Sequence, residues 1–378
     1  MRILRNYFAK EIYHAVFFVL IALLALFAFF DMLGEVRIVG IGPYKIEHAF
    51  LYVTLGMPTF AYELMPIAAL IGTIYVLSQF AARSEFSVMR ASTLSMFDSI
   101  KILIRIGLVL VIITFVLGEF IAPKATALAK DFKRQIFGAT VSSEFKSGLW
   151  AKDKIYSTNG KKIIGSRFLN ARKIENNGTL RDLKIYEFDL EMQMIALITA
   201  GEANFTGAGQ WLLNNVKKMQ FSKNISKLNE YKNSAFDSRH LATIVMNSEI
   251  TPEIMAVMVG DPNRMSAYDL AVFSKHLQDT KQRSDRYEIA LWKKIIYPFV
   301  VIVMMIIALP FAYLNTRSGG ISLKIFIGIM IGIAFHLSNN LFSHLGMLNF
   351  WPPIITVISP SLTFIFVVIF ALWWVNKY

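Results

Sequence analysis

Long runs without a charged residue set the strongest limit on what this chain can fold into. From Ile325 to Asn376 there is no Asp, Glu, Lys or Arg. This run is too long for one membrane-spanning helix of about 20 residues, and its length suits two such helices with a turn between them. The segment LGMLNFWPP, Leu345 to Pro353, predicts that turn.

Four further apolar runs predict membrane spans: Tyr13 to Phe30, Ala61 to Ala82, a run centred on Ile106 to Gly118, and Ile295 to Thr316. No small-residue cleavage site follows the first run, so it reads as an anchor rather than a removed signal peptide. The composition agrees, because mean hydropathy is +0.49 and only 17% of residues are charged, against about 25% in soluble domains. We therefore expect six spans, three on each side of one long insert.

Lys and Arg are concentrated in alternate short loops, which sets the expected orientation. The rich side carries these residues: Arg2, Arg5, Lys10, Arg83, Arg90, Lys101, Arg105, Arg317, Lys324 and Lys377. The opposite connection, Asp31 to Phe60, has only Arg37 and Lys45. Both termini are therefore expected in the cytoplasm and the insert, residues 123–288, outside. A net charge of +13 could suit nucleic acid, but in a membrane chain an anionic lipid surface is the simpler partner, so no nucleic acid is expected.

The insert has a β pattern. Six short runs are mostly rich in β-branched, aromatic or other apolar residues: Lys154 to Ser157, Lys162 to Ser166, Leu183 to Phe188, Met192 to Ile198, Trp211 to Phe221 and His240 to Met246. Asn-Gly and Gly-rich breaks separate several of them. The expected fold is an all-β sandwich or jelly roll. Met265 to Thr280 has helical spacing and starts with Ser266 and Asp269, which resembles a capping box.

Enzyme signatures are missing from the sequence. There is no GxxxxGK[ST] phosphate loop, no HExxH and no GxSxG. The chain has no cysteine, so thiolate metal sites and disulfides are excluded. We expect a non-catalytic protein that binds no cofactor.

The segment RSEFSVMRASTL, Arg83 to Leu94, is too charged to span a membrane. Phe86, Met89 and Thr93 share one helical face, with Glu85 and Arg90 beside them. One hypothesis is a short helix that docks on a soluble partner through Glu85 and Arg90. The alternative is a helix that lies on lipid head groups.

Three other features raise functional hypotheses. The fifth span carries His336, Asn340 and His344 on one face, which either lines a cavity or packs on a neighbouring helix. Gly328 and Gly332 form a GxxxG that permits close packing. Glu63 is the charged residue of the second span. It either has a function or is simply hydrated near the outer interface.

A basic cluster follows the third span: Lys124, Lys130, Lys133 and Arg134. At a membrane surface it suits anionic groups, such as lipid phosphates or a lipid-linked substrate. The alternative is a solvated helix face in which Asp131 is a partial partner.

Four stretches carry a resemblance to a known family: Tyr62 to Ser92, Gly118 to Pro123 (GEFIAP), Gly148 to Asp153 (GLWAKD) and Leu291 to Pro298 (LWKKIIYP). With them the chain resembles the LptF/LptG family of lipopolysaccharide-export permeases through most of its length. The resemblance implies an α-helical membrane protein with six transmembrane helices and a periplasmic β-jelly-roll domain. It implies three regions: helices one to three in 1–122, the β domain with flanking helices in 123–288, and helices four to six in 289–378.

The resemblance also implies partners. An LptG-like and an LptF-like subunit would pair with two copies of a cytoplasmic LptB-like ATPase, where ATP and Mg would bind. Lipopolysaccharide would pass from the inner membrane to an LptC/LptA-like periplasmic bridge. The family's coupling helix corresponds to residues 83–94. The residues that would contact the ATPase are Arg83, Glu85, Phe86 and Arg90, and Glu85 corresponds to the acidic anchor of that helix. Spans one and five would form lateral gates, which assigns Gly328, Gly332, His336 and Asn340 to a gate or cavity helix.

One departure concerns lipid contact. Family members often carry Lys at the outer end of the first span, where this chain has Asp31, Glu35 and Arg37. Arg37 is a candidate substitute, but the two carboxylates weaken it. Lys130, Lys133 and Arg134 are then the better candidates for phosphate contact.

Two other functions stay open on the residues. A membrane-anchored periplasmic scaffold or binding protein would use the β domain alone and would not need residues 83–94. A secondary transporter would need ion sites near the midplane, where His336 is the one ionisable candidate.

Overall fold

The protein is described by a computed structural model, which divides into two compact units. Unit 1 comprises Met1–Lys133, Pro262–Ala271 and Ser284–Tyr378, and unit 2 comprises Arg134–Asp261 and Val272–Arg283. The described residues are 2–85, 88, 95–137, 148–157, 162–175, 178–207, 209–221, 236–252, 254–255, 261–313, 320–348 and 351–377. Both expected domain boundaries, 122/123 and 288/289, fall inside helices, because hydropathy marks where a helix leaves the apolar region and not where it ends.

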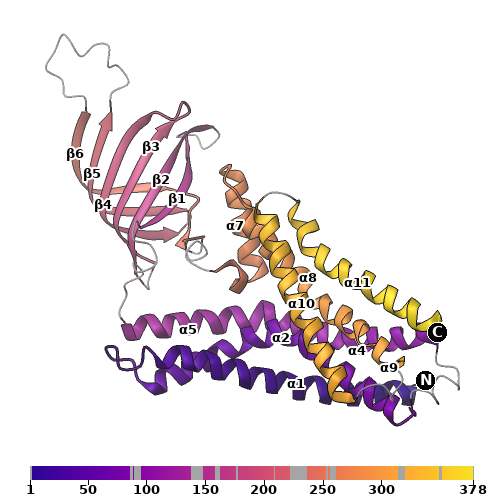
Figure 1. Ribbon diagram of the computed structural model, residues 1–378. Helices are drawn as coiled ribbons and strands as arrows, with labels where there is room; N and C mark the ends of the chain where they lie inside the picture. Colours follow the sequence, from indigo (N-terminus) through magenta and orange to yellow (C-terminus); the bar gives the residue numbers. More distant parts are fainter. Residues whose placement is uncertain are drawn as a thin grey trace. The chain divides into compact units, whose positions relative to one another are not determined.

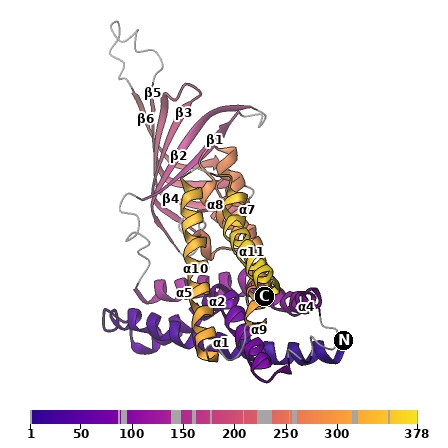
Figure 2. The ribbon, with the colours of Figure 1, turned by 45° about the vertical axis from the view of Figure 1, so that its right-hand side comes forward.

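Unit 1 is helical. Its principal helices are α1 (Arg2–Val36), α2 (Ile46–Ala82), α4 (Met96–Val116), α8 (Asp285–Ile307), α10 (Ile321–Met347) and α11 (Pro353–Lys377). Six helical segments of the described chain are long and apolar enough to cross a membrane. The predicted spans fall on them, and the expected turn after Leu345 lies between α10 and α11. In Figures 1 and 2, α10 and α11 run side by side and cross the direction of α1 and α2.

The third span does not stop where its apolar run stops. A π-helical turn, η1 (Leu117–Ile121), follows α4 and leads directly into α5 (Ala122–Phe137). Single π-helical turns inside α-helices occur frequently at functional sites. Span four ends differently: α8 stops at Ile307, and the short α9 (Pro310–Tyr313) follows, as expected where a proline interrupts the helical hydrogen bonds.

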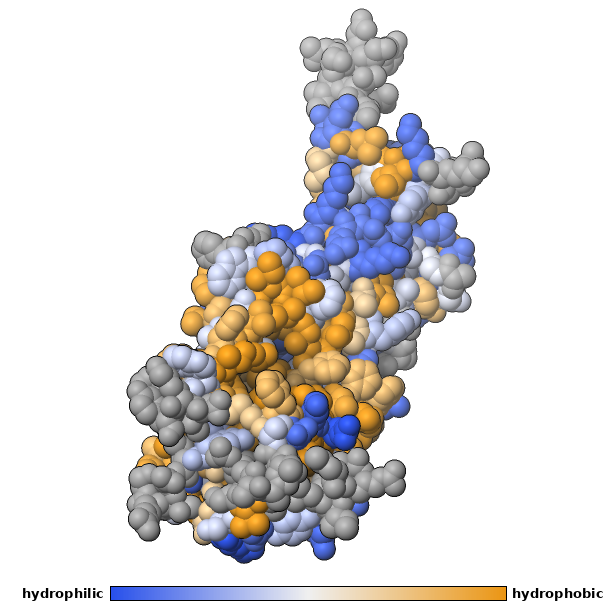
Figure 3. All heavy atoms as spheres, turned by 90° about the vertical axis from the view of Figure 1, so that its right-hand side faces the viewer, coloured by the Kyte–Doolittle hydropathy of each residue, from blue (hydrophilic) through white to orange (hydrophobic). Residues whose placement is uncertain are grey.

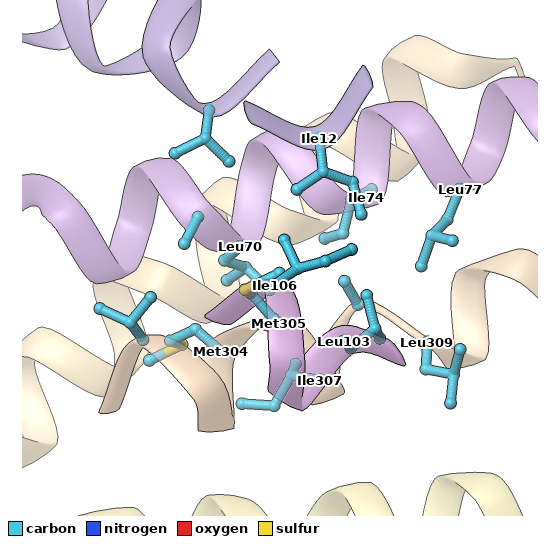
Figure 4. Close-up of a cluster of buried hydrophobic side chains, with 14 of the residues drawn as sticks. Ile12, Leu70, Ile74, Leu77, Leu103, Ile106, Met304, Met305, Ile307 and Leu309 are labelled. Atoms are coloured by element: carbon cyan, nitrogen blue, oxygen red, sulfur yellow. The ribbon is translucent and has the colours of Figure 1, made fainter. Parts of the chain in front are cut away.

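A buried apolar cluster holds the helices together. Figure 4 shows Ile12 of α1, Leu70 and Ile74 of α2, Ile106 of α4 and Met305 of α8 side by side. Glycines let the backbones approach closely. A Cβ at Gly72 would come 2.7 Å from the Val16 backbone nitrogen, and one at Gly107 would come 2.9 Å from the Ile302 side chain. Such small-residue contacts are typical of membrane helices.

The exterior of unit 1 is also apolar. Exposed large side chains follow α1, α4, α10 and α11, and Figure 3 shows a broad hydrophobic surface over the helices. A soluble protein rarely exposes patches of this extent. This surface suits hydrocarbon, and it is the surface expected of a membrane protein.

Unit 2 is built on a six-stranded antiparallel sheet in which every strand pairs with the next in sequence. The strands are β1 (Leu149–Tyr156), β2 (Ile163–Ile174), β3 (Leu180–Asp189), β4 (Met194–Gly207), β5 (Gln210–Phe221) and β6 (Phe236–Asn247). Each predicted β run overlaps one of them, so the expectation of a β domain is confirmed; its described strands form a single antiparallel sheet in sequence order. The sheet curves visibly in Figure 1.

A buried ion pair ties the two ends of this sheet. The Asp153 carboxylate of β1 accepts hydrogen bonds from Arg167 Nε at 2.9 Å and from the Ser248 hydroxyl at 2.7 Å. Arg167 also donates to the Asn247 carbonyl, where β6 ends. Side-chain exposure is 0% for Asp153 and 8% for Arg167. We call this group the sheet clasp.

Two local expectations can be compared with the structure. The N-cap at Ser266 is confirmed, because its hydroxyl accepts from the Asp269 backbone N–H at 3.1 Å at the start of α7 (Ala267–Asp279). The expectation that Asp31 to Phe60 is a loop is wrong, because α1 continues to Val36 and α2 begins at Ile46. Residues 31–36 and 46–60 are helical without a continuous apolar run, so hydropathy alone did not mark them.

Candidate functional site

Three sequence stretches that are far apart in the chain converge in unit 1. The Tyr62 ring of α2 packs on Gly118 of η1, where an added Cβ would lie 2.4 Å from ring carbon Cε2. The same ring lies 5.0 Å from the Tyr297 ring of α8, centroid to centroid. The Tyr297 hydroxyl donates to the Glu63 carbonyl at 2.5 Å. The π-helical turn therefore packs against the Tyr62 ring of α2, which leaves no room for a side chain at residue 118.

Charged groups surround this aromatic packing. The Lys294 ammonium is 5.1 Å from the Tyr62 ring centroid, within cation–π range. The Glu119 carboxylate accepts the Ala267 backbone N–H at 2.9 and 3.1 Å. A carboxylate on the first N–H of a helix satisfies an orphan donor and favours the helix dipole. Glu119 thus ties the π-helical turn to the start of α7.

A second polar group lies where α1 and α2 are joined, which we call the hairpin end of unit 1. The Lys133 ammonium of α5 contacts both oxygens of Glu35 on α1, at 2.8 and 3.0 Å. The Tyr44 hydroxyl donates to the same carboxylate at 2.8 Å. The ammonium also lies 4.4 Å from the Tyr52 ring centroid. Burial, and then the hydrogen bond to Glu35, raise the pKa of Tyr44 above its usual value, so this phenol stays protonated.

The other predicted phosphate contacts do not all join this group. Arg37 and Lys130 are exposed, and Arg134 is half-buried on α5. Of the four, Lys133 forms an ion pair with the Glu35 carboxylate. Glu35, one of the two carboxylates that weakened the prediction for Arg37, is therefore the partner of Lys133, the residue that was preferred to Arg37.

The predicted gate or cavity residues of α10 separate onto two faces. Gly328 and Gly332 are buried against α2, where an added Cβ would come 2.6 Å from Ile74 and 3.2 Å from Ile67. His336 and Asn340 are exposed, and the Asn340 amide lies 3.2 Å from His336 Nε2. The glycines serve packing within the chain, and the polar pair lies on the exposed side of a helix that is apolar enough to cross a membrane, where lipid is a poor environment for polar groups.

The predicted ATPase-coupling segment is only partly described. Phe86 and Arg90 lie outside the described residues. The Glu85 carboxylate accepts a hydrogen bond from the Tyr7 hydroxyl at 3.2 Å. The Arg83 guanidinium lies 3.9 Å from the same carboxylate. The Tyr7 ring stacks on Phe80 at 5.3 Å. The start of this segment is therefore attached to α1, a link that sequence reasoning missed because the two residues are far apart in the chain.

Unit 2 contains a cavity of about 630 Å³. Its lining mixes apolar side chains, including Ile198, Leu213 and Met246, with the charged Arg167, Glu187 and Lys218. The sheet clasp lies at this cavity. Across the described residues of both units, no three His, Asp or Glu side chains are arranged to hold a metal ion.

Comparisons with known proteins agree with this architecture. Residues 6–374 match the family described as "Lipopolysaccharide export system permease LptF/LptG". The chain is 28% identical over 372 residues to the Haemophilus influenzae protein named lipopolysaccharide export system permease protein LptG, covering 98% of this chain and 97% of that protein. It is 27% identical over 373 residues to the Escherichia coli K12 protein of the same name, with the same coverage.

Proposed function

Because the chain belongs to the LptF/LptG family of lipopolysaccharide export permeases, we propose that it is a transmembrane subunit of an ABC transporter. In this proposal the chain is the LptG-like subunit. The transporter extracts lipopolysaccharide from the inner membrane and passes it to an LptC/LptA-like periplasmic bridge. This chain performs no chemistry and binds no cofactor. ATP and Mg bind to two copies of an LptB-like ATPase in the cytoplasm.

The observation that supports this proposal best is the uncovered apolar face of α1 beside the polar hairpin end. Phe17, Phe18, Phe29 and Phe30 are all exposed along this helix. A lipid with several acyl chains and charged phosphates needs an apolar surface with cations at its edge. Here Lys133 lies at that edge, and Arg37, Lys130 and Arg134 are further candidates for phosphate contact.

The proposed orientation places both termini in the cytoplasm, and the hairpin end and unit 2 in the periplasm. An LptF-like subunit covers part of the apolar exterior, and α1 and α10 form lateral gates with it. His336 and Asn340 then meet the partner or the water-filled cavity between the subunits, which accounts for an exposed polar pair on a membrane helix.

Energy coupling enters through residues 83–94. ATP-driven closure of the ATPases moves this segment, and the Tyr7–Glu85 hydrogen bond passes the movement to α1. The movement shifts the population between two states of the lipid-binding cavity, one that accepts lipid and one that is collapsed. This shift requires that ATP binding to the ATPases stabilises one of the two states more than the other.

The test is purification of the tagged chain from its native membrane in mild detergent, followed by an ATPase assay. We expect a soluble ATPase and a homologous six-span partner to copurify and to hydrolyse ATP. Glu85→Ala should reduce the copurified ATPase, whereas Glu47→Ala, an exposed acidic residue at the other end of α2, should not. Equal recovery in both variants would remove Glu85 from the coupling site. Recovery of the chain alone would favour a membrane-anchored scaffold.

A further inference from the structure

The two faces of the sheet in unit 2 differ in burial. On one face Leu169, Ile185 and Ile198 are between 0% and 5% exposed. Successive side chains of a strand point to opposite faces, so the residues beside these three belong to the other face. We call that other face the outer face and describe it by two rows of side chains that cross all six strands. None of the twelve residues in these rows is buried.

The first row is basic. The strand register aligns one residue from each of β1 to β6 across the sheet: Trp150, Asn170, Lys184, Thr199, Lys217 and His240. Lys184 and Lys217 are both exposed, and they lie two strands apart, about 10 Å from one another along the row. The row contains no carboxylate, so no member of it neutralises the two ammonium groups.

The second row is mainly apolar. It lies two residues along each strand from the basic row and comprises Lys152, Phe168, Tyr186, Leu197, Met219 and Ser238. Its four central members are half-buried, and it too contains no carboxylate. The Lys152 ammonium at its end lies 5.8 Å from the Phe168 ring centroid. The outer face therefore separates an apolar row from a basic row by about 7 Å.

Aromatic packing fixes the shape of this face. The Trp150 and Tyr186 rings stack at 5.6 Å, centroid to centroid, with 23° between their planes. Phe168 meets Phe188 edge to face at 5.6 Å. Rings that are already ordered lower the entropic cost of binding, and aromatic residues and Met are enriched in protein–protein interfaces. A fluid lipid surface would need neither the fixed shape nor the separation into rows, so the face suits a partner that has a shape of its own.

We propose that the outer face of the sheet binds an acidic amphipathic helix of a partner protein. From Phe168 to Met219 the apolar row spans about 14 Å, which is the length of about nine residues of α-helix. Such a helix presents apolar side chains at a spacing of three and four on one side. Glu or Asp side chains on the adjacent flank then lie over Lys184 and Lys217. The inference goes beyond the proposed function, because it concerns unit 2 and a protein ligand and would hold whether or not the chain exports lipid.

The experiment uses the full chain in phosphatidylcholine nanodiscs and three synthetic peptides. The acidic peptide is a helix with Leu on one side and Glu on the adjacent flank. The basic peptide has Lys in place of each Glu, and the scrambled peptide has the composition of the acidic one without an apolar side. Fluorescence anisotropy, corrected with empty nanodiscs, measures affinity, and amine labelling read by mass spectrometry reports on Lys184 and Lys217. We expect the acidic peptide to bind at least about tenfold more tightly than the scrambled one and to protect both lysines.

Charge reversal tests the direction of the interaction. Lys184→Glu with Lys217→Glu should weaken binding of the acidic peptide by about tenfold, because two exposed ion pairs become repulsions. The same variant should gain affinity for the basic peptide, a gain that a misfolded sheet would not produce. The matched control, Lys275→Glu with Lys281→Glu, changes the charge of unit 2 equally at two other exposed lysines and should bind the acidic peptide as the wild type does.

Three results would overturn the inference. The first is equal binding of the acidic and scrambled peptides, and the second is an unchanged affinity in the Lys184→Glu, Lys217→Glu variant. The third is protection of Lys184 and Lys217 by phosphatidylglycerol vesicles or by polygalacturonate but not by the acidic peptide, which would assign the outer face to a lipid surface or to an acidic glycan. No readout involves lipopolysaccharide or an ATPase, so failure here is distinct from failure of the proposed function.

Discussion

Each unit of the protein contains a carboxylate that holds a cation, and the two pairs differ in everything around them. In the sheet clasp, Asp153 and Arg167 are almost fully buried. Asp153 also accepts from the Ser248 hydroxyl, and Arg167 also donates to the Asn247 carbonyl. At the hairpin end, Lys133 remains partly exposed beside Glu35. The first pair exposes almost none of its side-chain surface, whereas the second has a partly exposed cation that an incoming anion can reach.

The energetic consequences follow from burial. Loss of one partner in a buried pair leaves an uncompensated charge, which costs far more than the pair itself contributes. A partly exposed pair is screened by water and salt, so its loss costs little. The clasp is therefore suited to holding a fold, and the hairpin-end pair is suited to exchange.

The largest effect is expected for Asp153→Asn, which leaves the Arg167 guanidinium buried without its carboxylate. We expect the free energy of unfolding of unit 2 to fall by about 3–5 kcal/mol. Thermal unfolding of the full chain in detergent, with limited proteolysis of residues 148–252 as the local readout, measures it. The matched control is Asp237→Asn, whose exposed pair with Arg239 should change stability by less than about 1 kcal/mol. Equal effects of the two substitutions would mean that the clasp is not structural.

Ser248→Ala tests whether the clasp depends on its neutral members. The Ser248 hydroxyl donates to Asp153 and accepts the Ile250 backbone N–H at 3.1 Å. Its removal leaves two buried groups short of a partner, so we expect a loss of about 1–2 kcal/mol in the same assays. Ser238→Ala, an exposed serine of β6, is the control. A cost as small as the control's would show that water replaces the hydroxyl.

Tyr44→Phe makes the corresponding change at the hairpin end. It removes one hydrogen bond to Glu35 and leaves the pair with Lys133, so we expect a loss of about 0.5–1.5 kcal/mol. Hydrogen exchange of the last turn of α1 should quicken while its first half stays protected. Tyr268→Phe, an exposed residue of α7, should change neither. Slower exchange in Tyr44→Phe would contradict the role given to this hydroxyl.

The smallest effect concerns Tyr156, on the exposed border of the clasp. Its hydrogen bond to Glu249 raises the pKa of Tyr156 to about 12, from 10.0. A raised pKa means that the folded state favours the protonated phenol, so this contribution is complete below pH 10 and is lost as pH rises toward 12. Tyrosinate absorbance of the wild type minus that of Tyr156→Phe reports the titration. Glu249→Gln should bring the midpoint back toward 10, and an unmoved midpoint would exclude the hydrogen bond as the cause.

Features encoded over a short stretch of chain were predictable from the sequence. The uncharged run from Ile325 to Asn376 became α10 and α11, and each of the six β runs overlaps one strand. Helix length in lipid and alternation in a sheet depend on neighbouring residues, so a window of sequence contains the signal. The part of α2 that lies before Ala61 was missed, although buried Ala49 and Val53 at a spacing of four were a usable helical signal.

Pairings across the fold were not predictable. Lys133 was predicted as a phosphate contact from its basic neighbours, but the local pattern does not contain Glu35, which lies in a different span. The hydrogen bond between Tyr7 and Glu85 was hidden for the same reason. Sequence indicated which residues were charged, and only the packing of α1, α2 and α5 showed which charges meet.

The π-helical turn at Leu117–Ile121 has a consequence for how this family could change over evolution. Such a turn accommodates one residue more than a regular helix, and each residue advances the chain by about 100° around the axis. Deletion of a single residue there would restore an ordinary helix and leave the segments before and after it close to their present phase, because the wider turn already absorbs the extra residue. Deletion of one residue from the regular helix between Ala122 and Lys133 would instead turn Lys133 away from Glu35 by about 100°. The number of residues is therefore constrained within α5 and not within the π-helical turn.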